Sequence, residues 1–280
     1  MTRIDNIIKE NGSVRIVEVL PSYTNRSREL LPYGVTMGIP ALGDFYPSKN
    51  PSEESIVASA TAIGQGVNSV ATITVRDRLK WGTHSRLALA RLYDLENLLI
   101  VRGDASNGLD GNNGYDTADL ITETRLNHHR DFCIGAPVNQ YATNLDQEIE
   151  RAFRKNDADV DYFVTNAALE AGNVLDIRDR LRESGIHRPV IGNIGIPTGR
   201  RNLEVVEKTK GIRSLEETKK RLKERGDLET GKRIAIENTE RLKKEVDGFR
   251  YSLLSRQADQ IAAYKSLLEQ LECQVPLTIS

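Results

Sequence analysis

The chain has 280 residues, and its 39 basic and 40 acidic residues give a formal net charge of −1. This balance gives no electrostatic reason to expect nucleic acid or an anionic membrane as the main partner. No apolar run approaches the roughly 18 residues that span a bilayer, and the first residues lack the pattern of a secretory signal, so we expect a cytoplasmic protein.

Eight short apolar runs, most of them rich in β-branched residues, predict strands that are covered on both faces. They are Val14–Leu20, Tyr33–Ile39, Val67–Val75, Leu98–Val101, Phe132–Val138, Val160–Val164, Pro189–Ile194 and Phe249–Leu254. Helical patterns lie between most of them, at Ser52–Gly64, Arg86–Tyr93, Thr117–Arg125, Leu145–Lys155, Asn173–Glu183, Leu215–Glu224, Glu229–Glu245 and Gln257–Leu271.

Eight strands separated by helices predict one (β/α)₈ TIM barrel domain over residues 1–280, with a shortened or missing first helix. The alternative is a doubly wound sheet, but its usual glycine-rich fingerprint after the first strand is absent. Because barrel enzymes carry their active sites at the C-terminal ends of the strands, the residues at those ends are the candidate functional residues.

Glu18 lies near the end of the first strand, in VEVLPS, among apolar neighbours. A desolvated carboxylate keeps its proton closer to neutral pH, which suits general acid catalysis. The alternative is a structural glutamate that is paired with an arginine such as Arg15 or Arg102. On the third strand, alternation places Thr72 and Thr74 on one face, where they can bond a ligand or have a purely structural role.

The fourth strand runs into VRGDASNGLDGNNGYD, residues 101–116. This segment holds about a dozen mostly polar residues before the next helix, whereas a bare connection needs about two to six. Arg102 can form paired hydrogen bonds to a phosphate or carboxylate, Gly103 lets a ligand approach the backbone, and Asp104 can place a negative charge beside a developing cation. The segment therefore predicts a ligand-binding loop.

Three polar residues lie near the sixth strand. The Asn166 side chain can make two hydrogen bonds to a heteroaromatic edge. On the preceding helix, Arg151 and Lys155 share a face and can neutralise a diphosphate, although a solvated helix face is the alternative.

Metal ligands are not indicated. The two cysteines match no metal or redox spacing, so we expect free buried thiols. The dispersed histidines are expected at the surface. They are His84, His128, His129 and His187.

Taken in order, these motifs resemble the 5,10-methylenetetrahydrofolate reductase family, whose members are (β/α)₈ barrels and mostly flavin-dependent. VEVLPS resembles the family's first-strand motif, GVTMG the second, and NLLIVRGD the fourth with its RGD signature. KNDADVDYFVTN resembles the stretch that leads through the sixth strand, GIP at Gly195–Pro197 the seventh-strand motif, and FRYSLLSR the eighth with its closing arginine.

This resemblance implies an oxidoreductase of one-carbon metabolism and methionine biosynthesis. Such an enzyme reduces 5,10-methylenetetrahydrofolate to 5-methyltetrahydrofolate with NAD(P)H and bound FAD. Glu18 would be the general acid that helps to open the five-membered ring of the folate, and Asp104 would lie near the flavin and steady an iminium cation. Asn166 and Arg256 would contact the folate. The flavin would be bound by Thr36, Arg102, Gly103, Asp104, Tyr115, Arg151 and Lys155. Association into a homo-oligomer is a further expectation.

The sequence departs from the family pattern where ring systems would bind. Asn166 replaces a glutamine, Ala136 a tyrosine and Gln140 a histidine, and no Phe, Tyr or Trp lies between Phe163 and Phe249. Two alternatives therefore remain. One is a folate enzyme of the same fold without FAD, which uses direct hydride transfer from NAD(P)H or methyl transfer with a partner protein. The other is a non-catalytic barrel.

Overall fold

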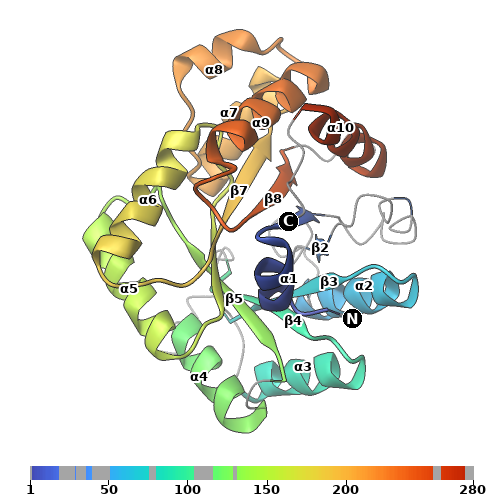
Figure 1. The fold of residues 1–280 in the computed structure, drawn as a ribbon, viewed down its shortest axis with the longest axis vertical. Coiled ribbons are helices and arrows are strands. Elements are labelled where there is room, and N and C mark those ends of the chain that lie inside the picture. Colours follow the sequence, from blue (N-terminus) through green and yellow to red (C-terminus); the bar gives the residue numbers. More distant parts are fainter. Residues whose placement is uncertain are drawn as a thin grey trace.

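The structure is a computed structural model, and it describes residues 2–18, 29, 36–39, 51–75, 80–103, 116–128, 131–254 and 260–274. Within these residues, eight parallel strands close into one barrel in sequence order, and helices lie outside the strands (Figure 1). The strands are β1 (Val14–Glu18), β2 (Thr36–Ile39), β3 (Ser69–Thr74), β4 (Asn97–Val101), β5 (Cys133–Val138), β6 (Tyr162–Thr165), β7 (Val190–Ile196) and β8 (Gly248–Leu253). Each overlaps one predicted strand, so the predicted (β/α)₈ fold is confirmed.

The helices agree less closely with the sequence patterns. They are α1 (Ile4–Asn11), α2 (Pro51–Gly64), α3 (Lys80–Leu92), α4 (Thr117–His128), α5 (Leu145–Asp157), α6 (Ala171–Glu183), α7 (Arg200–Lys210), α8 (Glu216–Arg221), α9 (Leu228–Leu242) and α10 (Gln260–Gln274). Helices α1 and α7 were not predicted from the sequence. Most of the segment that was expected to hold a shortened first helix, between β1 and β2, lies outside the described residues.

Helix α1 closes the N-terminal end of the barrel. Its residue Ile4 is fully buried and packs with side chains of the barrel interior. The backbone N–H of Ile4 donates to the Asn97 Oδ1 atom on β4 at 2.8 Å, and Asn97 Nδ2 donates to the Thr2 carbonyl at 3.2 Å. A functional site is therefore confined to the opposite, C-terminal mouth.

Strand alternation sorts side chains between the barrel interior and the helix layer. Thr72 faces the interior, whereas Ala71 and Ile73 belong to the cluster between the strands and the helices, as the alternation predicted. The interior cluster is apolar and consists of Ile4, Val14, Ile16, Val70, Leu99, Cys133, Tyr162, Val164 and Ile191.

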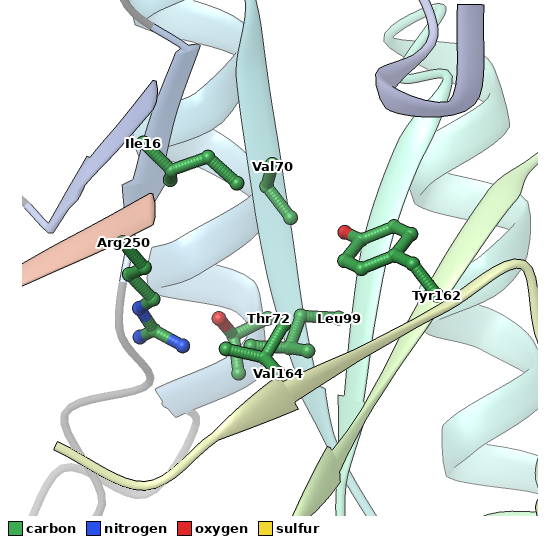
Figure 2. Close-up of a pocket in the computed structure, with 7 residues that line it drawn as sticks. All are labelled: Ile16, Val70, Thr72, Leu99, Tyr162, Val164 and Arg250. Carbon is green, nitrogen blue, oxygen red and sulfur yellow. The ribbon is translucent and has the colours of Figure 1, made fainter. Parts of the chain in front are cut away.

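Tyr162 fills the middle of the barrel and is 1% exposed. A Cβ atom on Gly135 would lie 2.3 to 2.7 Å from the Tyr162 ring and hydroxyl, so a glycine is needed opposite the ring. The ring borders a cavity of about 10 Å³, roughly the room that one water molecule needs (Figure 2). The other lining residues are Ile16, Val70, Thr72, Leu99, Val164 and Arg250.

Replacing Tyr162 by phenylalanine is expected to leave the free energy of unfolding unchanged or to raise it by about 1 kcal/mol. The reason is that the buried hydroxyl has no hydrogen-bond partner in the described part of the chain, and an unsatisfied buried hydroxyl is costly. In contrast, Gly135→Ala is expected to cost about 1–3 kcal/mol through overpacking. Denaturant unfolding measures both, and a clear loss of stability in Tyr162→Phe would contradict the prediction.

Candidate active site

Glu18 and Arg250 meet at the C-terminal mouth of the barrel. Glu18 is the last residue of β1, and its Oε1 atom lies 3.0 Å from Nη2 of Arg250 on β8. The other carboxylate oxygen accepts a hydrogen bond from the Ser252 hydroxyl. The Ser252 Oγ atom also lies 2.8 Å from Asn193 Oδ1 on β7. Two side chains of β8 thus hold the carboxylate of β1, and Asn193 contacts only Ser252.

The arginine that pairs with Glu18 is Arg250, not Arg15 or Arg102. Arg15 follows an inward-facing residue, so alternation turns it toward the helix layer, where it pairs with Glu272 on α10. Arg102 is exposed just beyond the end of β4. The Glu18 side chain is 22% exposed and ion-paired, so it is not the desolvated, isolated carboxylate that its apolar neighbours suggested.

Arg250 and Ser252 were missed as site residues, although the sequence carries a signal for them. They alternate with Phe249 and Tyr251, which are fully buried in the layer between the strands and the helices. A charged residue and a hydroxyl on the opposite face of such a strand must therefore point into the barrel.

Three side-chain amides form a network at the ends of β5 and β6. Asn166 Nδ2 donates to Asn139 Oδ1 at 2.9 Å. The side chain of Gln140 bonds the backbone of Asn166 twice, through Nε2 to the carbonyl at 2.8 Å and through Oε1 from the N–H at 2.9 Å. Gln140 therefore fixes the position of Asn166, which was predicted to contact a ligand ring.

Arg151 and Lys155 share a face of α5, as predicted, but they also share an acidic partner. The Glu148 Oε2 atom lies 3.4 Å from Arg151 Nη1, and its Oε1 atom lies 3.9 Å from Lys155 Nζ. Lys155 Nζ donates to the carbonyl of Pro137 at 2.7 Å, and burial lowers the pKa of Lys155. Lys155 is thus turned toward β5, whereas the Arg151 side chain is 46% exposed.

The remaining predicted site residues are only partly described. Gly103 follows β4 with φ at 84°, a conformation that favours glycine. Asp104, Tyr115 and Arg256 lie outside the described residues, as does the side chain of Thr36, so their roles stay predictions. The described structure resumes at Asp116, which accepts a hydrogen bond from the N–H of Ala118 at the start of α4.

The described ranges hold neither a metal site nor a membrane-spanning helix. They contain no group of three or more His, Cys, Asp or Glu side chains able to hold a metal ion. None of the helices described is both long enough and apolar enough to cross a membrane. Cys133 is a free buried thiol whose pKa is raised by burial, as expected for a structural cysteine.

Sequence comparisons identify related proteins. The sequence model of a family described as "Methylenetetrahydrofolate reductase" matches residues 13–248. "Methylenetetrahydrofolate reductase 1" from Schizosaccharomyces pombe is 28% identical over 117 residues, which cover 38% of this chain and 19% of that protein. The match thus spans about a fifth of the length of this curated relative.

Solved structures share the fold. An uncharacterized protein from Clostridium thermocellum, described as binding two copies of 5-methyl-5,6,7,8-tetrahydrofolic acid, has a TM-score of 0.70 at 13% identity and covers 96% of this chain and 98% of its own. A phosphoenolpyruvate phosphomutase from Streptomyces platensis subsp. rosaceus has a TM-score of 0.52 at 15% identity, and the match covers 67% of this chain and 70% of the phosphomutase chain. At these identities the likeness establishes the barrel fold alone.

Proposed function

Because this chain belongs to the methylenetetrahydrofolate reductase family, we propose that it reduces 5,10-methylenetetrahydrofolate to 5-methyltetrahydrofolate with NAD(P)H. The observation that carries the proposal is the carboxylate of Glu18, held at the barrel mouth by Arg250 and Ser252. The Clostridium thermocellum neighbour binds the methylated folate that this reaction would form, which supports a folate ligand.

The reaction consumes one proton and one hydride. We assign the proton to Glu18, which would donate it to the folate nitrogen that separates from the methylene carbon when the five-membered ring opens. The methylene carbon is then part of an iminium cation, and the hydride adds to it to complete the methyl group. Glu18 is left as a carboxylate beside Arg250 and regains its proton from water.

Arg102 and Gly103, which follow β4, and the exposed Arg151 of α5 have the chemistry that binding the diphosphate of FAD requires. Arg102 is exposed, Gly103 leaves the backbone open to close approach, and Arg151 is half exposed. We propose that these three bind the diphosphate and that Lys155 supports β5 instead, since its ammonium group is used by Pro137. FAD bound here would carry the hydride from NAD(P)H to the folate.

The visible spectrum of the purified protein tests the flavin. Protein that is yellow, or becomes yellow on addition of FAD, and that needs FAD for oxidation of NAD(P)H by the folate would support the proposal. Full turnover by a colourless protein that binds no FAD would contradict the flavin while leaving the folate reaction intact.

Replacing Arg102 by alanine is expected to weaken FAD binding about tenfold to a hundredfold, because one charge-assisted hydrogen bond is lost. Titration of FAD, followed by its fluorescence, measures the dissociation constant. Arg188→Ala is the matched control: Arg188 precedes β7 at the opposite end of the barrel and pairs with Asp159 at 3.0 Å. Equal weakening in both variants would remove Arg102 from the proposed flavin site.

One observation favours a second candidate, a folate reductase without FAD. Glu148 lies against both Arg151 and Lys155, so it offsets one of the two positive charges that were predicted to face a diphosphate. In this case NAD(P)H would pass its hydride directly to the folate. Calorimetry separates the candidates, because folate binding without FAD binding supports the second one only.

A further inference from the structure

We propose that Arg250 is a positioning residue that fixes the Glu18 carboxylate at the barrel mouth and stabilises the charge left after Glu18 gives up its proton. This inference rests on the proposed function, because Arg250 acts on the reaction only through Glu18. Neither the sequence motifs nor the comparisons assign a role to Arg250.

The register of the barrel explains how Arg250 reaches Glu18. Strands β1 and β8 are neighbours, and Ile16 is the register partner of Arg250. Glu18 is the next residue after Ile16 on the same face, so it lies one step closer to the mouth than Arg250 does. The guanidinium therefore approaches the carboxylate from inside the barrel, at 3.0 Å, while Ser252 provides the second hydrogen bond.

The surroundings of Arg250 leave it little freedom to point elsewhere. Its side chain is 12% exposed and lines the interior cavity together with Tyr162 (Figure 2). Among the described residues, Glu18 is the one carboxylate within ion-pair distance of Arg250. A charge in an apolar interior is costly without a partner, so each member of this pair holds the other in place.

The chemical consequence concerns the step in which the folate ring opens. When the proton leaves Glu18, Arg250 and Ser252 both donate hydrogen bonds to the new carboxylate, and such charge-assisted bonds are the strong ones. Losing the guanidinium would let the carboxyl group move away from the position in which it reaches the folate nitrogen. Because Arg250 lies below Glu18, away from the mouth, the effect is expected on kcat and not on KM.

A double-mutant cycle tests the proposal. Arg250→Met in the wild-type background is expected to lower kcat about 10²-fold, the cost of a misplaced catalytic group, with KM nearly unchanged. In the Glu18→Gln background the same substitution is expected to change kcat little, because the group on which it acts is already gone. Arg250→Lys is expected to restore part of the loss because it keeps the charge.

Two results would overturn the proposal: wild-type kcat in Arg250→Met, or the same fold-loss in both backgrounds. If Arg250→Met does not fold, Arg250→Gln replaces it in the cycle, since it removes the charge that faces Glu18 but keeps a polar side chain at that position. Its expected loss in kcat is about tenfold and again depends on Glu18.

If the proposed function itself is wrong, the wild-type protein shows no folate turnover, which distinguishes this case from a failure of the Arg250 proposal. The same four proteins of the cycle are then compared by thermal unfolding. A non-additive change in their midpoints supports the positioning contact between Arg250 and Glu18, and strict additivity overturns it.

Discussion

Glu18→Gln is expected to lower kcat for methylenetetrahydrofolate reduction about 10²-fold to 10⁴-fold, the usual contribution of a general acid. The amide has almost the same shape as the carboxyl group, and its oxygen can still accept a hydrogen bond from Arg250 while its NH₂ group faces the Ser252 oxygen, but the amide cannot act as an acid. The measurement is steady-state oxidation of NAD(P)H in the presence of the folate, with circular dichroism to verify the fold.

A matched control for this prediction is Glu237→Gln on α9. Glu237 pairs with Arg221 through contacts of 2.7 and 2.8 Å at the surface, and such pairs contribute about 1 kcal/mol or less. The kcat of the Glu237→Gln variant is expected to equal that of the wild-type protein. Abolished turnover in Glu18→Gln alone would rule out the non-catalytic barrel, whereas full turnover would exclude Glu18 as the acid.

Gly231→Ala is expected to lower the free energy of unfolding by about 3 kcal/mol or more. Gly231 lies on α9, and a Cβ atom there would be 1.7 Å from the carbonyl oxygen of Pro197 and 2.9 Å from its carbonyl carbon. Both atoms are backbone, so no side chain can rotate away, and α9 has to move off the loop that follows β7. Denaturant unfolding measures the loss.

Gly172→Ala provides the control, because Gly172 is also helical and a Cβ atom there meets nothing within 4 Å. Alanine is the better helix former, so this variant is expected to be neutral or up to about 1 kcal/mol more stable. Similar stability of the two variants would mean that α9 lies farther from Pro197 than the structure places it.

The fold was predictable because strands that are covered on both faces leave short, mostly apolar runs, and each of the eight strands overlaps such a run. Helix α7 was missed because its sequence, RRNLEVVEKTK, has few apolar residues, and of these Leu203 is buried whereas Val205 is half exposed. Helix α1 was missed although Ile4, Ile7 and Ile8 have helical spacing, because it has only eight residues and precedes the first strand of the alternating strand and helix pattern.

The site was predictable only in part. Glu18 stands out because a charged residue interrupts an apolar strand, but its partners Arg250 and Ser252 lie on β8 and become its neighbours only when the barrel closes. The two hydrogen bonds between the Gln140 side chain and the Asn166 backbone likewise join two separate loops that the fold brings together. Such contacts depend on the register between strands, and this register cannot be inferred from the spacing of residues within a single motif.

The closure of β1 against β8 has a consequence for biosynthesis. Glu18 and Ser252 are 234 positions apart in the sequence, so their contact cannot form until the ribosome has released almost the whole described chain. Until then, a nascent barrel exposes two unpaired strand edges, which can associate with other chains. Contacts between such distant segments also slow folding. Under the proposed function, a chain that stops before β8 is therefore expected to be inactive, because Glu18 then lacks both Arg250 and Ser252.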